Sequence, residues 1–355
     1  MDAGLESIIA AETILSDVNG LEGRLIIRGF DLAYLVKSTN FESMLALLWS
    51  GFFSVDLAQN DMEKRLGLAR LAAFERLQTI PSANPIETLR IGLCLSPDGE
   101  GLEEAIALVA TAVVATAMSA RRARGLLPIR PNAQLTQAGD LLRMITGEVP
   151  CEATTAALDT YLVTVSDHGL NASTFAARVV ASTRAGLSSA AIAGLSALKG
   201  PLHGGAPGPV LDMLDAIGDP NNAALWIDEA LKRGERLMGF GHRVYRVRDP
   251  RADALKRAVA GLPSSSGRLN YASVIETAAL VQLAQRYPTR KLETNVEFYT
   301  ALLLEALDIP RDVFTCVFAC GRIGGWIAHA KEQIATHRLI RPMSIYVGAA
   351  VREAA

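Results

Sequence analysis

Three of the five histidines stand in surroundings that suit chemistry better than packing. His203 lies in Gly200-Pro201-Leu202-His203-Gly204-Gly205, and His242 lies in Gly239-Phe240-Gly241-His242-Arg243. His168 follows a serine and an aspartate and precedes the run Asn-Ala-Ser-Thr. Glycine neighbours leave a histidine uncovered and let the backbone approach a ligand closely. Two such imidazoles, with a carboxylate from elsewhere in the chain, would supply acid–base catalysis.

The sequence after His203 predicts a helix that begins within a few residues. The positive end of a helix dipole disfavours protonation of a histidine placed there. A neutral imidazole can donate a hydrogen bond to a developing oxyanion without giving up its proton. The same position also fits a turn histidine that bonds only to the backbone, and the spacing leaves both interpretations open.

His242 is followed by a strongly basic segment. Arg243, Arg246, Arg248 and Arg251 all fall within the ten residues that begin at His242. Guanidinium groups bind carboxylates and phosphates through a planar fork, so the segment predicts an anion-binding surface. A solvated basic loop would have the same composition, but the glycines beside the histidine favour a functional site.

Two more charged residues lie in apolar surroundings. Glu297 stands in Asn-Val-Glu-Phe-Tyr, where desolvation would raise its pKa and suit it as a general base near neutral pH. An acidic residue in the first turn of a helix is also common for dipole reasons alone. Arg322 lies in an apolar segment with three glycines close by, and a guanidinium there needs an anionic partner.

The remaining histidines and the cysteines give weaker signals. Arg341, in a basic tail, is typical of a solvated residue, and we interpret His329 and His337 as structural. The cysteines lack the spacing of a metal site, so we expect small apolar core residues in a reducing compartment. They are Cys94, Cys151, Cys316 and Cys320.

Helical periodicity dominates the elements that must position these residues. The sequence is rich in Ala and Leu, and a capped helix over residues 41–49 ends before Gly51. The other predicted helices cover residues 58–78, 84–95, 102–122, 135–147, 152–166, 171–185, 188–198, 206–216, 222–237, 250–260, 271–286, 295–307 and 311–335.

Strand signals are few, and they favour an all-α fold. Residues 23–28 predict one arm of a short hairpin near the N-terminus. Strands and helices do not alternate at the βαβ period, and neither a dinucleotide-binding glycine motif nor a P-loop is present in the sequence. Residues 200–209, rich in glycine and proline, predict a hinge beside His203, between two helical domains.

Composition narrows the class of protein. Half of the 355 residues are hydrophobic and 20% are charged, which predicts a large buried core. A net charge of −2 gives no general attraction to nucleic acid or to a membrane, so we expect neither as a partner. The apolar run over residues 105–120 is short for a membrane span and predicts a buried helix. Without a signal-peptide pattern, the expected location is the cytoplasm.

Several segments, taken together and in this order, resemble the citrate synthase family. The likeness covers most of the chain and is strongest between Asp167 and Pro342. The resemblance implies the reactions of that family, in which an acyl-coenzyme A thioester condenses with a 2-oxo dicarboxylate. The segments are residues 27–31, 48–51, 167–175, 200–206, 239–245, 308–333 and 341–342.

The family resemblance also implies an architecture. We expect a large, dimer-forming helical domain over residues 1–205 and 309–355, and a small helical domain over residues 206–308. The two domains would close over the substrates, in a homodimer. The resemblance implies no metal and no cofactor, since the coenzyme A thioester is a substrate.

The family's catalytic roles can be carried over by position. His203 would hold the thioester oxygen as the enol forms, and His242 would polarise the ketone of oxaloacetate. Glu297 would be the catalytic base. Removing a proton next to a thioester needs a base and an oxyanion partner on opposite sides of one small group, which agrees with these assignments.

Binding roles follow in the same way. His168, Arg251 and Arg322 would bind the carboxylates of oxaloacetate. Arg341 would join them from the partner subunit. Arg246, beside the His242 turn, would face the phosphates of coenzyme A.

The sequence departs from the family pattern at four places. Glu297 stands where the family has an aspartate, which lengthens the side chain by one methylene, and a displacement of about 1 Å can cost on the order of a hundredfold in rate. Gly169 replaces a frequent glutamate. Residues 207–209, Pro-Gly-Pro, replace a more polar run, and Met343 stands where a second basic residue is common.

Three functions remain open at this stage. The first is condensation of acetyl-coenzyme A with oxaloacetate to give citrate, as in the tricarboxylic acid cycle. The second is a 2-methylcitrate synthase that uses propionyl-coenzyme A. The third is a weakly active relative that binds a dicarboxylate or coenzyme A as a sensor. The polar site residues are kept in kind, which disfavours the third.

Overall fold

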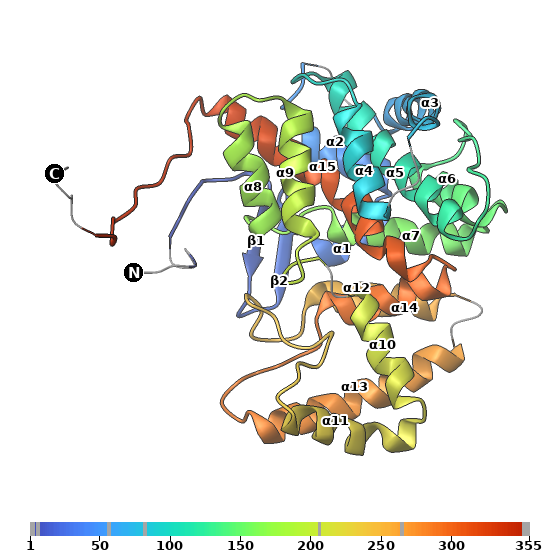
Figure 1. Cartoon of the computed structure of the whole chain (residues 1–355), viewed down its shortest axis with the longest axis vertical. Helices are drawn as coiled ribbons and strands as arrows, with labels where there is room; N and C mark the ends of the chain where they lie inside the picture. The colour runs from blue at the N-terminus through green and yellow to red at the C-terminus, as the bar shows by residue number, and fades with distance from the viewer. Residues whose placement is uncertain are drawn as a thin grey trace, which may run out of the picture.

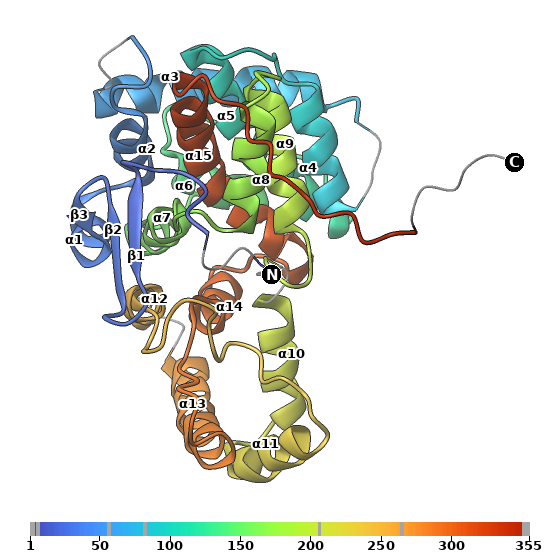
Figure 2. The same ribbon diagram turned by 90° about the vertical axis from the view of Figure 1, so that its left-hand side faces the viewer.

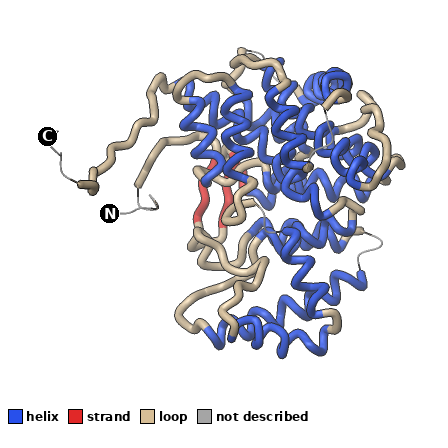
Figure 3. The backbone as a smooth tube through the Cα atoms, in the orientation of Figure 1, coloured by secondary structure: helices blue, strands red, loops and turns tan. Residues whose placement is uncertain are grey.

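A computed structural model describes Gly4 and residues 8–54, 58–80, 84–204, 207–262 and 266–349. The described part is helical apart from a small sheet near its N-terminus (Figure 3). The strands are β1 (Ser16–Asn19), β2 (Arg24–Ile27) and β3 (Phe30–Asp31). The α-helices are α1 (Leu32–Ser38), α2 (Phe41–Trp49), α3 (Gln59–Leu77), α4 (Pro85–Cys94), α5 (Leu102–Ala123), α6 (Gln137–Thr146), α7 (Glu152–Val165), α8 (Ala172–Ala181), α9 (Leu187–Leu198), α10 (Pro207–Ile217), α11 (Ala223–Lys232), α12 (Pro250–Ala260), α13 (Ser266–Arg286), α14 (Val296–Ala306) and α15 (Phe314–Ala335). Two 3₁₀ turns are η1 (Pro220–Asn222) and η2 (Arg311–Val313).

The prediction of a helical fold with a short hairpin is confirmed. The three strands pair antiparallel in the order β1-β2-β3, with Ser16 opposite Ile27 and Asn19 opposite Arg24. Alternation along β2 places Leu25 and Ile27 in the core. The hairpin therefore packs by one face against the helical body.

One helix was missed by the sequence analysis. α1 follows β3 directly, and the side chain of Asp31 caps it by accepting from the backbone N–H of Ala33. Its seven residues give too few turns for a clear helical period. The helix predicted over residues 222–237 was drawn too long, because Gly234 takes a φ of +77° and ends α11.

The longest apolar helices form the core of the fold. α5 packs against α3, α4, α6, α9 and α15, and most of its residues are buried. Acidic side chains in its first turn and arginines in its last turn interact favourably with the helix dipole and stabilise α5. Two helical segments, α5 and η2 with α15, are long and apolar enough to be candidate membrane spans. However, 78% and 94% of their most apolar windows are buried within the protein. The prediction of a buried helix over residues 105–120 is confirmed.

The helices gather at two ends of the molecule. α2 to α9 and α15 form one end, and α10, α11 and α13 form the other (Figures 1 and 2). α12 and α14 lie between them, and both pack against α7. The predicted boundary between residues 205 and 206 lies outside the described residues, and the division into domains stays a prediction.

Candidate active site

A glycine turn shapes the segment that carries His242. Gly239 and Gly241 have φ values of +87° and +80°, which L side chains rarely adopt. The N–H of Gly241 donates to the carbonyl of Glu293 (2.7 Å), and the side-chain amide of Asn295 donates to the carbonyl of Gly241 (2.8 Å). The His242 turn is thus tied to the residues that lead into α14.

The backbone fixes the tautomer of His242. Its Nδ1 accepts hydrogen bonds from the N–H groups of Val244 (3.0 Å) and Tyr245 (3.1 Å), so the proton of the neutral imidazole is on Nε2. Burial and the charge of Arg251 lower its pKa to about 4, which keeps it neutral at pH 7. Arg251 Nη2 lies 3.2 Å from Nε2. Two donors therefore face each other, and an oxygen acceptor would satisfy both.

Arg251 is held by a buried carboxylate. The guanidinium donates to Asp249 through Nε (3.0 Å) and Nη2 (2.8 Å). Asp249 also caps α12 by accepting from the N–H of Arg251, and it accepts from the N–H of Val296 at 3.2 Å. This carboxylate joins the basic segment to the first turn of α14.

Glu297 occupies that first turn. Its N–H donates to the capping side chain of Asn295 (3.0 Å), which sets the direction in which α14 leaves the turn. Its Oε2 is buried and accepts no hydrogen bond from the described residues. Burial, offset in part by the charge of Arg251, raises the pKa of Glu297 to about 7. A carboxylate with such a pKa suits general-base catalysis near neutral pH.

His203 is anchored by the N-terminus of α8. Its Nε2 lies 2.8 Å from the hydroxyl of Ser173. That hydroxyl also accepts from the indole N–H of Trp326 (3.1 Å) and donates to Oδ1 of Asn171 (2.7 Å), the residue that caps α8. Burial, followed by the charges of Arg322 and Arg251, lowers the pKa of His203 to about 4. The neutral imidazole predicted from the sequence is supported.

His168 lies beside His242. The two rings have centroids 5.5 Å apart, and Nε2 of His168 lies 3.1 Å from the hydroxyl of Tyr245. Burial and the charges of Arg251, His242 and Arg322 lower the pKa of His168 well below its ordinary value. Its neighbours therefore favour a neutral hydrogen-bonding group over a cation.

Glycines on α15 allow Arg322 to lie against the end of α7. A Cβ on Gly321 would lie 2.5 Å from the side chain of Val165, and one on Gly325 would lie 2.2 Å from the carbonyl of Ser166. Arg322 is 1% exposed and donates through Nε to the carbonyl of Val165 (2.5 Å). Its Nη2 is buried without a partner among the described residues, and burial lowers its pKa to about 10.

These side chains surround one small region. The charges of Arg251 and Arg322 both act on Glu297, His168 and His203. Neither Glu297 Oε2 nor Arg322 Nη2 has a hydrogen-bond partner in the described part of the chain. The region presents a carboxylate that can accept a proton, neutral imidazoles that can donate hydrogen bonds, and guanidinium groups that can bind an anion.

Comparison with known proteins shows the family to which this chain belongs. The family model "Citrate synthase, C-terminal domain" matches residues 4–343. The chain belongs to the citrate synthase family. The citrate synthase of Haloferax volcanii is 36% identical over 97% of this chain and 95% of its own length. The 2-methylcitrate synthase of Mycobacterium tuberculosis is 34% identical over 97% and 90%.

A solved structure shows that the likeness extends to the fold. The citrate synthase of Thermoplasma acidophilum, solved as a ternary complex with carboxymethyl coenzyme A and oxaloacetate, superposes with a TM-score of 0.88. It is 25% identical and covers 100% of this chain and 98% of its own. The protein is accordingly an acyltransferase of the citrate synthase type with the helical fold of that family, as the sequence motifs predicted.

Two of the site residues predicted from the citrate synthase family are exposed, unlike the buried groups described above. Arg246 is exposed on the basic loop, and its backbone N–H donates to the carbonyl of Gly20 (2.8 Å). Arg341 is exposed in the C-terminal segment, which extends away from the helical body (Figure 1). The role expected for Arg341 depends on a second subunit, and both binding roles stay predictions.

Several residues that shape this citrate synthase site were not singled out by the sequence analysis. Ser173, Asp249 and Tyr245 are hydrogen-bonded to His203, Arg251 and His168 in turn. Trp326 donates to Ser173. Each lies within a few residues of a predicted histidine or arginine, or inside a motif used for the family resemblance. Only their position beside a chemical group in space gives them a role. Gly169, where the family often has glutamate, takes a φ of +60°, which glycine adopts without strain.

Proposed function

We propose that the protein condenses acetyl-coenzyme A with oxaloacetate to give citrate and free coenzyme A. The proposal rests on one observation: hydrogen-bond donors that lack acceptors lie near the buried carboxylate of Glu297, whose Oε2 has no partner among the described residues. His242 Nε2 and Arg251 Nη2 face each other at 3.2 Å, and Arg322 Nη2 is unpartnered among the described residues. A small dicarboxylate with a ketone would supply the missing oxygens.

Enolisation of the thioester needs a base and an oxyanion partner. Glu297 removes a proton from the carbon next to the thioester carbonyl, and the electron pair moves to the carbonyl oxygen. His203 donates a hydrogen bond to that oxygen. This role requires the proton on Nδ1, so Nε2 must accept a hydrogen bond. The Ser173 hydroxyl, which donates to Oδ1 of Asn171 at 2.7 Å, would turn to donate to Nε2 when the thioester binds. The Trp326 N–H, at 3.1 Å, occupies a lone pair of Ser173 Oγ and helps to orient the hydroxyl.

Carbon–carbon bond formation follows at the ketone. The enol carbon attacks the ketone carbon of oxaloacetate while His242 Nε2–H stabilises the negative charge that develops on the ketone oxygen. Arg251 and Arg322 hold the carboxylates, and Asp249 keeps Arg251 in place. Water then cleaves the thioester, which releases the thiol of coenzyme A and a third carboxylate. Closure of the two proposed domains would exclude water until the new bond has formed.

A second candidate is 2-methylcitrate synthesis from propionyl-coenzyme A. Glu297 is one methylene longer than the family's aspartate, so the space for the acyl chain cannot be inferred from the family pattern. The likeness to both citrate and 2-methylcitrate synthases supports either substrate. A sensor with little catalysis would keep the binding groups and release no thiol.

We also propose a homodimer in which Arg341 completes the partner's site. The C-terminal segment is extended and exposed, and it carries several apolar side chains that a single chain leaves in water. Leu339, Met343 and Tyr346 are 59%, 95% and 79% exposed. Burial of such side chains against a second copy would be favourable.

One experiment separates the candidate functions. The protein is mixed with oxaloacetate and either acetyl- or propionyl-coenzyme A, and free thiol is followed with a chromogenic reagent. The higher kcat/KM identifies the acyl substrate, and no release above background with either thioester would reject a synthase. Glu297→Asp is assayed beside it, and we expect it to stay active because the carboxylate is kept. Full activity of Glu297→Gln would contradict the assignment of the base.

A further inference from the structure

The turn of the N-terminal hairpin lies against the segment that carries His242. The carbonyl of Gly20 accepts from the N–H of Arg246 (2.8 Å). A Cβ on Gly20 would lie 2.2 Å from the carbonyl oxygen of Val244, and one on Gly23 would lie 2.7 Å from the side chain of Val247. Backbone thus approaches backbone at Gly20 more closely than any residue with a side chain permits. Nδ1 of His242 accepts a hydrogen bond from the N–H of that same Val244.

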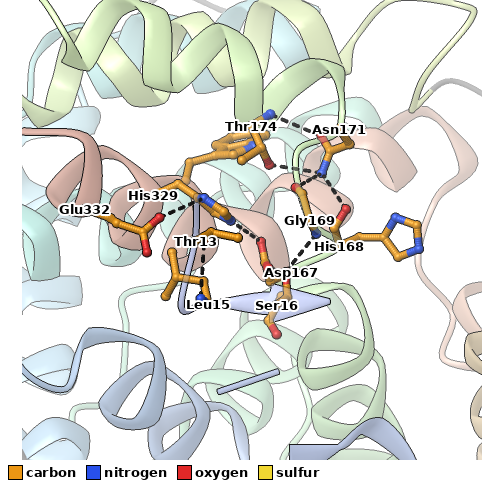
Figure 4. Close-up of polar contacts among 12 residues, drawn as sticks. Thr13, Leu15, Ser16, Asp167, His168, Gly169, Asn171, Thr174, His329 and Glu332 are labelled. Carbon is orange, nitrogen blue, oxygen red and sulfur yellow. Dashed lines mark hydrogen bonds and ion pairs between the residues drawn. The ribbon is translucent and has the colours of Figure 1, made fainter. Parts of the chain in front are cut away.

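The first strand of the hairpin contacts the segment that carries His168. The hydroxyl of Ser16 donates to the buried carboxylate of Asp167 and accepts from the N–H of Gly169 (3.0 Å). Ser16 therefore holds the residues on both sides of His168. Figure 4 shows the His168 ring pointing away from this cluster.

A hydrogen-bonded network behind Ser16 makes the contact rigid. Nε2 of His329 lies 3.1 Å from Asp167, and Nδ1 lies 3.0 Å from Nη1 of Arg178. The tautomer with its proton on Nε2 donates to Asp167 and accepts from Arg178, so both contacts are satisfied. Arg178 pairs with Glu332, which accepts from the N–H of Ile14 at 2.8 Å. The network returns to the chain two residues before Ser16.

We infer that the β1–β2 hairpin is a positioning element that holds His168 through Ser16 and His242 through Gly20. The hairpin is the element that contacts both histidine-bearing segments, one at each end of β1. The ring centroids of His168 and His242 are 5.5 Å apart. A small shift at the Ser16 or the Gly20 contact would therefore change the distance between two groups that bind one ligand. This inference rests on the proposed function, in which both histidines bind oxaloacetate.

The kinetic test uses four variants of the full chain. Ser16→Ala removes the hydroxyl, Ser16→Thr keeps it, and Gly20→Ala forces the turn away from Val244. Asp17→Asn is the matched control, because Asp17 is the exposed neighbour of Ser16 in β1. Initial rates are measured with oxaloacetate and acetyl-coenzyme A varied separately.

The expected pattern is selective for oxaloacetate. Displacement of a binding group by a fraction of an ångström to 1 Å should raise the KM for oxaloacetate about tenfold or more in Ser16→Ala and Gly20→Ala. Ser16→Ala should leave the KM for acetyl-coenzyme A unchanged. Gly20→Ala should raise this KM as well, since Arg246 lies on the displaced loop. Ser16→Thr and Asp17→Asn should behave as the unmodified protein. Equal losses in Ser16→Ala and Asp17→Asn would overturn the inference.

Hydrogen exchange gives a readout that does not depend on catalysis. Without substrate, amides of residues 239–249 should exchange faster in Gly20→Ala, and amides of residues 166–171 should exchange faster in Ser16→Ala. Unchanged exchange at both segments overturns the inference whatever the activity. If exchange is faster in the variants but the unmodified protein releases no thiol, the positioning role is supported. The proposed function is then rejected.

Discussion

Asp249 and Arg251, two residues apart in the chain, form a buried ion pair with two hydrogen bonds of 2.8 and 3.0 Å. The same carboxylate accepts from the N–H of Val296, the residue before Glu297. One side chain thereby links Arg251, the proposed oxaloacetate-binding cation, to the first turn of α14, which carries the proposed base Glu297.

Replacement of Asp249 by asparagine should be strongly destabilising. It leaves the 4% exposed Arg251 without its counter-charge, and removal of one partner of a buried pair costs about 3–5 kcal/mol. We expect this loss in the free energy of unfolding from urea denaturation, together with a large fall in kcat/KM. Asp253→Asn is the control, since Asp253, on α12, pairs with Arg248 but is 45% exposed, and its loss should cost about 1 kcal/mol or less. Similar losses for the two variants would contradict the role of Asp249.

The activity should depend on the ionisation of Glu297. Burial raises its pKa to about 7, and a general base must be deprotonated to act. We therefore expect kcat/KM to rise with pH through about 7 and then to level off. The measurement is the rate of thiol release between pH 5.5 and 8.5. A profile that stays flat down to pH 5.5 would show that another group is the base.

Glu297 should also lower the stability of the protein above neutral pH. Its pKa in the folded protein, about 7, exceeds the ordinary value of 4.5, so the folded state binds the proton more tightly than the unfolded chain. The stabilising contribution of the protonated form is complete below about pH 4.5 and is lost as pH rises through 7. At pH 8, the free energy of unfolding of Glu297→Gln should exceed that of the unmodified protein by up to about 3 kcal/mol. Near pH 4.5 the two free energies should differ little.

Urea denaturation across this pH range checks the prediction. Burial also raises the pKa of Asp159 to about 7, so both proteins share that second transition and it cancels in their difference. A difference that is constant with pH would argue that Glu297 is not the titrating group.

The helices could be predicted because each repeats an apolar face, whereas the site depends on contacts that the sequence does not display. α14 and α15 were placed nearly to the residue by periodicity and turn signals. The roles of His203 and His242 came from glycine neighbours and from family motifs. Ser173 and Asp249 look like ordinary helix-capping polar residues until the fold brings them to His203 and Arg251.

His329 shows the same limit from the other side. We interpreted it as structural, and it is fully buried on α15. Its contact with Asp167, 162 positions away, connects it to the residue beside His168. Sequence spacing carries no signal for a contact of that separation.

Ser173→Ala should reduce kcat more than it affects oxaloacetate binding. The variant removes the hydroxyl that lies 2.8 Å from His203 Nε2, and with it the hydrogen-bond partner that orients the imidazole ring. A misdirected donor commonly costs on the order of a hundredfold in rate. Ser196→Ala on α9 is the control, because that exposed hydroxyl bonds only to its own helix at Ile192. An unchanged kcat in Ser173→Ala would mean that His203 is oriented by other contacts.

Arg322→Lys should abolish most of the stabilisation that oxaloacetate gives to the folded protein. The buried Nη2 of Arg322 is unpartnered among the described residues, and a lysine keeps the charge but loses the planar fork that binds a carboxylate. A ligand at 100 times its Kd stabilises a protein by about 2.7 kcal/mol, which a thermal denaturation curve resolves. We expect a clear rise in Tm with oxaloacetate for the unmodified protein and a much smaller one for Arg322→Lys. Arg90→Lys, an exposed change on α4, should keep the full rise. If Arg322→Lys also kept it, the anion would have to bind elsewhere, and the assignment of Arg251 and Arg322 to the dicarboxylate would be wrong.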